Sequence, residues 1–181
     1  MMLLAAEDSI LLVVDLQERL LPAIAGAERV VERAGILVKA AGILQVPVLA
    51  TEQYPRGIGA TVPELAAAIG PGATVEKIHF SAAAEPGFLD RIRSLERRQI
   101  VICGTEAHVC VLQTAVGLRA LGYDVYVAAD ATGSRDPENR ALALSRMMGA
   151  GIRVVSTEMV AFEWMGRAGT PVFKDVLALI K

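Results

Sequence analysis

The stretch that decides the fold is Gln99-Ile-Val-Ile-Cys-Gly-Thr-Glu-Ala-His-Val-Cys-Val-Leu-Gln-Thr114. Residues 100–103 form a continuously apolar, mostly β-branched run of the kind found in strands that are buried on both faces. Gly104 is expected to end this strand, and from Val109 onward apolar residues recur at helical spacing. This order of strand, turn and helix predicts a parallel α/β sheet, with Cys110 in the first turn of the helix.

Cys110 has two interpretations. Open α/β sheets place their ligands at the carboxyl ends of parallel strands, and the positive end of a helix dipole lowers the pKa of a thiol and favours the nucleophilic thiolate. Free cysteine is also among the most buried residue types and usually behaves as a small hydrophobe. Taken alone, Cys110 leaves a catalytic role and a structural role open.

Composition restricts the class of protein. The chain has 181 residues, of which 54% are hydrophobic but only 4% aromatic, so its core must be built from Ala, Val, Ile and Leu. The length predicts one domain over residues 1–181. A formal net charge of −2 with interspersed signs argues against a nucleic-acid partner, and no apolar window is long enough to cross a membrane. No signal peptide or disulfide framework is recognisable, so a cytoplasmic location is expected.

Strand-like and helix-like segments alternate along the rest of the chain. Strands are predicted over residues 9–15, 43–51, 122–130 and 152–156, with a short extended segment over 74–81. Helices are predicted over 28–41, 63–69, 87–95 and 137–150, with a final helix through residues 176–180. This alternation requires right-handed crossovers, and it predicts a three-layer α/β/α architecture around a parallel sheet.

Two further polar residues lie at or near strand ends. Asp15 ends the apolar run of residues 9–14, where it either points into the same crevice as Cys110 or caps the segment after it. Lys77 has apolar neighbours, which favour an enclosed position over the solvated one that lysine usually takes. If the three residues meet, Asp15 can move the thiol proton, Lys77 can stabilise both anions, and backbone N–H groups at the helix start can bind an oxyanion.

The chain resembles the isochorismatase-like cysteine hydrolases, a family that includes nicotinamidase, N-carbamoylsarcosine amidohydrolase and isochorismatase. The resemblance lies in Leu11-Leu-Val-Val-Asp-Leu-Gln17, Glu76-Lys-Ile-His-Phe-Ser81 and Gly104-Thr-Glu-Ala-His-Val-Cys-Val-Leu-Gln-Thr-Ala115, and Thr51-Glu-Gln-Tyr-Pro-Arg-Gly-Ile-Gly59 is similar to an uncharacterised isochorismatase-domain branch.

The resemblance implies both a fold and a set of roles. The fold is a Rossmann-like, six-stranded parallel sheet in a three-layer domain. Cys110 would be the nucleophile, Asp15 the general base and acid, and Lys77 the third catalytic residue. The resemblance also implies a non-proline cis peptide between Thr105 and Glu106, with the N–H groups of Glu106 and Cys110 forming an oxyanion hole.

Departures from the family pattern narrow the range of expected substrates. Nicotinamidases bind a divalent metal through Asp and His residues after the second strand, where this chain has Glu52-Gln-Tyr-Pro-Arg56 without histidine. No metal and no other cofactor are therefore expected, and nicotinamide is not the expected substrate. True isochorismatases lack the cysteine, so isochorismate is not expected either.

Five residues are candidates for contact with a substrate. His108 takes the place of a common acidic residue of the family; a helix-lining histidine is more often structural, although at this position it can also meet a substrate. Three of the other candidates are aromatic, and aromatic residues are found more often in the core of a protein than in a substrate pocket. A position in the core is therefore the alternative for these three. The candidates are Gln17, Tyr54, Phe80, His108 and Trp164.

We therefore expect a cysteine hydrolase that cleaves a C–N bond of a small amide or carbamoyl compound through a covalent thioester intermediate. Two alternatives stay open: the same fold acting on an ester or thioester, and a non-catalytic family member that serves as a binding or assembly subunit. The apolar residues 160–164 suggest a surface buried between subunits. The resemblance to the family implies a homo-oligomer, a dimer or tetramer.

Overall fold

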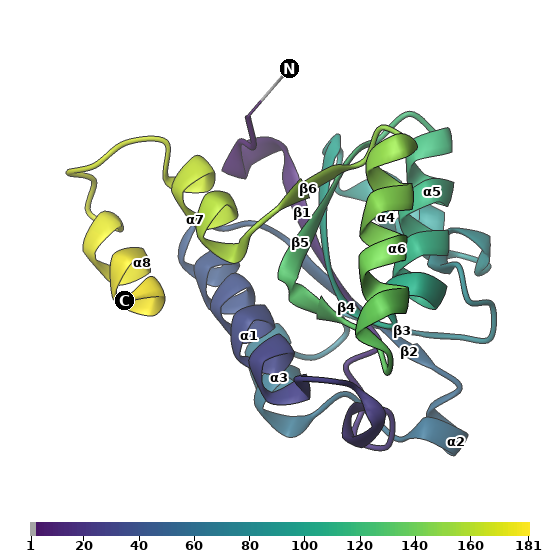
Figure 1. Cartoon of the computed structure of the whole chain (residues 1–181). Helices are drawn as coiled ribbons and strands as arrows, with labels where there is room; N and C mark the ends of the chain where they lie inside the picture. Colours follow the sequence, from purple (N-terminus) through teal and green to yellow (C-terminus); the bar gives the residue numbers. More distant parts are fainter. Residues whose placement is uncertain (1–2) are drawn as a thin grey trace.

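The computed structural model describes residues 3–181 and has at its centre one six-stranded sheet between two layers of helices (Figure 1). All five strand pairs are parallel, and the strand order is β3-β2-β1-β4-β5-β6. The strands are β1 (Ser9–Val14), β2 (Val48–Gln53), β3 (Thr74–Lys77), β4 (Gln99–Thr105), β5 (Asp124–Gly133) and β6 (Arg153–Val155). The predicted three-layer α/β/α architecture with six parallel strands is confirmed.

The two central strands, β1 and β4, are buried along their whole length, as their uninterrupted apolar sequences predict. The chain runs outward from β1 through β2 to the edge strand β3, then crosses to β4 and runs outward on the other side through β5 and β6. The strand order therefore reverses between β1 and β4. Such a switch point opens a crevice at the carboxyl ends of the strands, where open α/β sheets bind their ligands.

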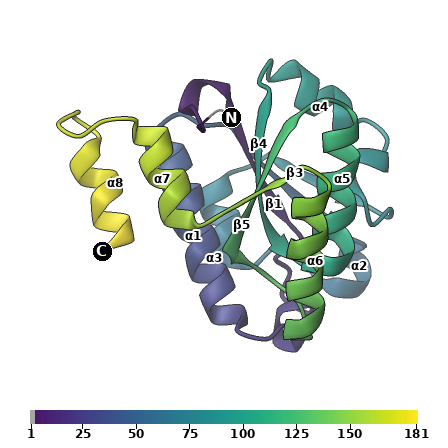
Figure 2. The same ribbon diagram turned by 45° about the horizontal axis from the view of Figure 1, so that its top comes forward.

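The helices cover both faces of the sheet. They are α1 (Ala27–Ile43), α2 (Pro55–Ile58), α3 (Pro63–Ile69), α4 (Phe88–Ser94), α5 (Leu112–Ala120), α6 (Pro137–Gly149), α7 (Thr157–Met165) and α8 (Phe173–Ile180). Figures 1 and 2 show α1, α3, α7 and α8 on one side, and α4, α5 and α6 on the other. Alternate residues of β1 belong to the two separate apolar cores on either side, because successive side chains of a strand point to opposite faces.

The strand β4 is longer than predicted. Gly104 does not end β4, which continues to Thr105. Gly104 has φ +123°, and a Cβ at this residue would lie only 1.9 Å from the carbonyl oxygen of Val14 in β1. The glycine is therefore needed for the close approach of the two central strands rather than for a turn. A π-helical turn, Ala107–Val111, follows Glu106 and leads directly into α5.

The segment after β6 also differs from the prediction. Residues 157–165 form α7, a helix that was not predicted, and the apolar residues Val160, Ala161 and Trp164 pack inside the chain instead of forming an exposed surface. Phe162 of the same segment stays 43% exposed, so a subunit interface there stays a prediction. Within the part of the chain that the structure describes, no helix is long and apolar enough to cross a membrane.

Candidate active site

A buried ion pair connects two strands at the carboxyl edge of the sheet. Asp15 directly follows β1 and Lys77 ends β3, so the strand β2 lies between them. The Nζ atom of Lys77 lies 2.7 Å from Oδ2 of Asp15, and neither side chain is exposed to solvent. Of the alternatives that the sequence left open, Lys77 is enclosed rather than solvated, and Asp15 points into the crevice.

Three hydrogen bonds, two with Thr51 and one with Thr105, fix the position of Asp15. The Thr51 hydroxyl at β2 donates to Oδ1 of Asp15 at 2.7 Å, and the Thr105 hydroxyl at the end of β4 donates to its carbonyl oxygen at 2.7 Å. The N–H of Asp15 donates to the carbonyl oxygen of Thr51 at 3.1 Å. The backbone of Asp15 has φ +49°, in the left-handed region that non-glycine residues seldom occupy. Strained backbone held by its surroundings is common at functional sites.

Cys110 completes the cluster from the π-helical turn after β4. Its thiol interacts with both the Asp15 carboxylate and the Lys77 ammonium, so the three predicted residues come together. Burial and the nearby Asp15 charge raise the pKa of the Cys110 thiol to about 12, and Lys77 offsets only part of this rise. The expectation that the pKa of this thiol is lowered is therefore wrong, because burial and the Asp15 charge outweigh the effect of Lys77.

The carboxyl group of Asp15 is also perturbed. Burial raises its pKa above the ordinary value of 3.8, while Lys77, Thr51 and Cys110 act in the opposite direction. Lys77 thus limits this rise but does not cancel it. A carboxylate with a raised pKa is a stronger base than an ordinary aspartate, so it is better matched to a thiol that must be deprotonated during attack.

The backbone between β4 and Cys110 has an unusual course. The Thr105–Glu106 peptide bond is cis. The carbonyl oxygen of Glu106 accepts hydrogen bonds from the N–H groups of Val109 at 3.1 Å and Val111 at 3.2 Å. The N–H of Cys110 lies between these two donors in the chain and does not share their acceptor. The role of this N–H, with that of Glu106, in binding an oxyanion stays a prediction.

The loop after β5 is fastened to this turn by two side-chain contacts. Glu106, which is almost fully buried, accepts hydrogen bonds through Oε2 from the backbone N–H of Arg135 at 3.2 Å and from its Nε at 2.9 Å. Nδ1 of His108 lies 3.0 Å from the Ser134 hydroxyl. His108 therefore has a structural partner in the protein.

The remaining candidates occupy three different environments. Tyr54 and Phe80 are 52% and 54% exposed, on the segments that follow β2 and β3, and Tyr54 lines a cavity of about 270 Å³ together with Lys77. Gln17 is buried with its amide bonded to the backbone of Gln53 and to the carbonyl oxygen of Gly59. Tyr54 and Phe80 are thus placed near Lys77, whereas Gln17 has no free hydrogen-bonding group.

Trp164 lies at the wrong end of the sheet for a pocket residue. Its indole N–H donates to the hydroxyl of Ser9 at 2.9 Å, and Ser9 begins β1 whereas Asp15 follows its end. Six strand residues span roughly 20 Å. The expectation that Trp164 lines the substrate pocket is therefore wrong, because α7 places it in the core near the amino ends of the strands.

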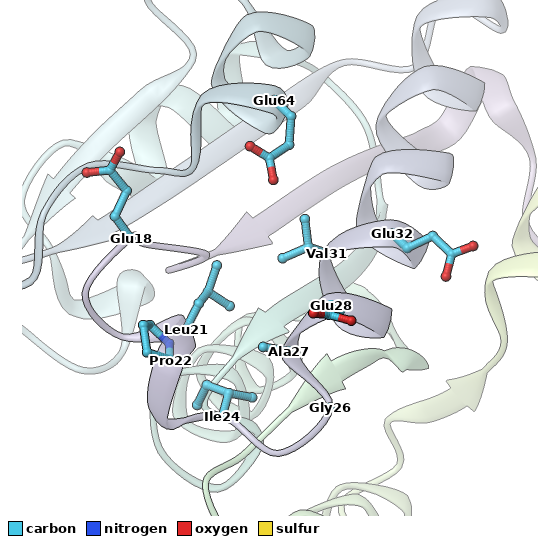
Figure 3. A pocket seen from close by; sticks show the side chains of 10 residues that line it. All are labelled: Glu18, Leu21, Pro22, Ile24, Gly26, Ala27, Glu28, Val31, Glu32 and Glu64. Atoms are coloured by element: carbon cyan, nitrogen blue, oxygen red, sulfur yellow. The ribbon is translucent and has the colours of Figure 1, made fainter.

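The largest cavity that we describe lies beside the cluster and does not contain it. Its volume is about 770 Å³, and it is formed by the segment after β1 and the first turns of α1 and α3. Figure 3 shows glutamates around its apolar floor. Cys110 keeps 6% exposure, but within residues 3–181 none of the cavities that we describe is lined by Asp15 or Cys110. The same residues contain no group of three or more His, Cys, Asp or Glu side chains placed to hold a metal ion.

Several residues that hold the cluster together were not predicted. Thr51 and Gln53 contact it from the end of β2 and Thr105 from the end of β4, while Arg135 in the loop after β5 binds Glu106, which precedes the turn that carries Cys110. A usable indication was present for β2, because Thr51-Glu-Gln53 is a polar run that ends an apolar strand at the same sheet edge as Asp15. Arg135 carried no comparable indication in the sequence.

Comparison with known proteins places the chain in a family. Residues 9–159 match the model of the isochorismatase domain. The chain is similar to isochorismatase domain-containing protein 2 of Rattus norvegicus, with 38% identity over 97% of this chain and 82% of the relative, and to its counterpart in Xenopus laevis, with 38% identity over 98% and 85%.

Solved structures agree with this assignment. The structure of the MAR1 ribonuclease from Caenorhabditis elegans superposes with a TM-score of 0.93 at 34% identity and covers 99% of this chain and 92% of that chain. The YcaC gene product of Escherichia coli, at 24% identity and a TM-score of 0.90 over 99% of this chain and 88% of that one, shares the fold. The fold of the family supports a hydrolytic function. The chain belongs to the isochorismatase-domain family.

Proposed function

We propose that the protein is a cysteine hydrolase that cleaves the C–N bond of a small amide or carbamoyl compound through a thioester intermediate. One observation carries the proposal: the Cys110 thiol contacts a fully buried Asp15–Lys77 ion pair at the switch point of the sheet. A nucleophile beside a base that is itself held by a third group is the general pattern of covalent hydrolysis.

Acylation begins from the neutral thiol. The Asp15 carboxylate takes the thiol proton while the sulfur attacks the carbonyl carbon, so a C–S bond forms and the carbonyl becomes an oxyanion. The backbone N–H groups of Glu106 and Cys110 receive this oxyanion, and the Lys77 ammonium balances the charge of the site. When the C–N bond breaks, Asp15 returns its proton to the leaving nitrogen, and the amine departs.

Deacylation uses the same groups in reverse. A water molecule attacks the thioester carbon while Asp15 takes one of its protons. The C–S bond then breaks, the acid product leaves, and the proton on Asp15 returns to the sulfur. Each group ends in its starting state, and no cofactor is needed for the balance of atoms.

Alkylation of the two cysteines tests the activated sulfur. We expect iodoacetamide at mild pH to modify Cys110 faster than Cys103, measured by mass spectrometry of the peptides, because only Cys110 has a carboxylate in contact to accept its proton. The Asp15→Asn variant keeps the shape of the side chain and should lose the difference. Equal rates for the two cysteines in the native protein would contradict the proposal.

A panel of small substrates tests the bond that is cleaved. Amides and carbamoyl compounds should be hydrolysed in preference to matched esters and thioesters, with release of the amine as the readout. A preference for esters would favour the alternative chemistry on the same residues. RNA belongs in the panel because one structural relative is named a ribonuclease, although the net charge of −2 argues against a nucleic-acid substrate here.

A second function has an observation of its own. Cys110 keeps only 6% exposure, and Asp15 is fully buried. A closed site would suit a binding or assembly subunit that has lost catalysis. Absence of alkylation at Cys110 together with an inactive substrate panel would favour this function over hydrolysis.

We also propose that residues 1–181 act as one domain, that copies of the chain assemble into a homo-oligomer, and that the protein is cytoplasmic. Large apolar side chains left exposed on a single chain, such as Leu142 and Met148 of α6, support the assembly. Two free cysteines suit a reducing compartment. Light scattering of the purified protein gives the number of copies, and a monomer at micromolar concentration would contradict the assembly.

A further inference from the structure

We infer that Gln53 is a positioning residue of this site, which holds the Lys77 ammonium beside Asp15 and Cys110 without adding a charge. The inference rests on the proposed function for its meaning in catalysis, but the geometry stands separately. Gln53 ends β2, the strand between the one that Asp15 follows and the one that Lys77 ends. Its side chain is therefore in reach of both partners of the ion pair.

The contact with Lys77 is short and oriented. Oε1 of Gln53 accepts a hydrogen bond from Nζ of Lys77 at 2.6 Å, comparable with the 2.7 Å from the same Nζ to Asp15. The amide nitrogen of Gln53 donates to the carbonyl oxygen of Ile78 at 2.8 Å. Because these two partners require an acceptor and a donor respectively, only one orientation of the amide satisfies both.

The ammonium has few other acceptors. Besides its interaction with the Cys110 sulfur, its remaining contacts are the carbonyl oxygens of His79 and Phe80 at 3.4 and 3.3 Å, which are longer than ordinary hydrogen bonds. An ammonium group has three N–H donors, and a buried one without acceptors is strongly unfavourable. Gln53 and Asp15 therefore supply the two short contacts that fix the position of Nζ.

Gln17 in turn fixes Gln53. Oε1 of Gln17 accepts from the backbone N–H of Gln53 at 2.8 Å, and Nε2 of Gln17 donates to the backbone carbonyl of Gln53 at 3.0 Å. The contacts thus run from Asp15 through Lys77 and Gln53 to Gln17. Gln17 lies only two residues after Asp15 in the sequence. This assigns to Gln17 a role in support of the site rather than in contact with substrate.

The neutral charge of Gln53 has a chemical reason. The charged groups that face the Cys110 thiol are Asp15 and Lys77, while α6 contributes the apolar residues Ala143 and Met147 to the surrounding core. One anion and one cation leave the buried group without net charge while the sulfur is protonated. A glutamate in place of Gln53 would add a second anion, draw Lys77 away from Asp15, and oppose formation of the thiolate.

The first experiment follows Lys77 itself. The chain has four lysines, so ¹⁵N-lysine labelling gives a small set of ammonium signals, and Lys77→Met assigns the one of interest. We expect a protected Lys77 ammonium signal in the native protein. In Gln53→Met, which keeps the length of the side chain but lacks the acceptor, its hydrogen exchange should be about tenfold faster or the signal lost. Unchanged exchange in this variant would overturn the inference.

The matched control is Gln45→Met. Gln45 precedes β2 whereas Gln53 ends it, and its side chain is exposed, so the same substitution there should leave the Lys77 signal unaltered. Thermal unfolding followed by circular dichroism verifies that both variants fold. Because this readout does not involve the sulfur, it decides the role of Gln53 even if Cys110 proves unreactive and the proposed function fails.

The second experiment measures the effect on the sulfur. Gln53→Met should slow alkylation of Cys110 at pH 8 by about tenfold while leaving Cys103 unchanged, because the displaced ammonium no longer stabilises the thiolate. General loosening of the fold would instead expose both cysteines and speed both reactions. Gln53→Glu should shift the pH profile of Cys110 alkylation upward. A profile identical to that of Gln45→Glu would overturn the part of the inference that concerns charge.

Discussion

The two cysteines of the chain lie in one strand–turn–helix unit, yet their surroundings have little in common. Cys103 lies inside β4 in the apolar core that faces α1, and Cys110 lies in the turn after the same strand. Burial is the first cause that raises the pKa of each thiol to about 12. The difference is that Cys110 contacts a carboxylate and an ammonium. The pair shows that a thiol in this fold is distinguished by a neighbouring proton acceptor rather than by its own acidity.

Removal of each sulfur in turn should give the largest difference in activity between the two cysteines. We expect Cys110→Ala to lower hydrolysis of the best amide of the panel about 10⁴-fold or more, because the nucleophile is lost. Cys103→Ala should leave the rate within a few-fold, since this thiol only fills space in the core. Rates are measured as kcat/KM. Comparable losses in the two variants would mean that the sulfur of Cys110 has no chemical role.

The glycine between the two cysteines should be the next most sensitive position. Gly104→Ala introduces a Cβ at φ +123° and 1.9 Å from the Val14 carbonyl oxygen, so β1 and β4 must separate. We expect a loss of about 4 kcal/mol or more in the free energy of unfolding, or failure to fold, by urea denaturation.

Gly149→Ala is the control for this substitution. Gly149 ends α6, has open space around it and has an ordinary φ, so alanine should be neutral or stabilising by roughly 0.5 kcal/mol. If Gly104→Ala were tolerated as well as this variant, the close approach of the two central strands would not be a constraint on the fold.

The charges around Cys110 should give the third largest effect. Lys77→Ala leaves the Asp15 carboxylate buried without its cation, which should cost about 3 kcal/mol in the free energy of unfolding. Lys174→Ala, at an exposed position of α8, should cost almost nothing. The double variant Asp15→Asn with Lys77→Met should recover much of the loss. No recovery would mean that Lys77 stabilises the fold by packing rather than by charge.

Alkaline pH should reveal what the two cysteines share. An unfolded thiol ionises near its ordinary pKa of 9.0, whereas each folded thiol does so only near 12. Between these values the unfolded state gives up a proton that the folded state keeps. The free energy of unfolding should therefore fall by about 1.4 kcal/mol per pH unit for each thiol as the pH rises above 9.

Alanine variants isolate this effect from other groups that titrate at alkaline pH. Cys103→Ala and Cys110→Ala should each make the decline in stability shallower by a similar amount, measured by urea denaturation between pH 8 and 10. A decline that is shallower for one variant only would show that the two thiols are not equally shielded from solvent in the folded state.

The layers and most elements of the fold could be predicted because they depend on local patterns. The uninterrupted apolar runs at residues 10–14 and 100–103 predicted the two central strands, and the helix Pro63–Ile69 was predicted with its observed bounds. The end of β4 could not be predicted, because the sequence does not distinguish a glycine that makes a turn from one that allows two backbones to approach closely. The helix α7 was missed since its nine residues carry little amphipathic pattern.

The residues that meet in the cluster could be predicted from the sequence, but the pKa of the thiol could not. Asp15, Lys77 and Cys110 were singled out by type and position, and the resemblance to a family brought them together. The state of the sulfur depends on how much water the fold removes, which no local pattern records. Trp164 was misplaced for a related reason: the sequence does not say at which end of the sheet a helix delivers its side chains.

The position of β3 at one edge of the sheet makes the site dependent on a strand that has a single neighbour. Lys77 comes from this four-residue strand, which pairs with β2 alone, whereas Asp15 follows a central strand. Any opening of β3 would take the cation away and leave the anion enclosed, so such an opening carries an electrostatic penalty beyond its lost backbone hydrogen bonds. The Asp15–Lys77 ion pair therefore helps to hold this edge strand on the sheet.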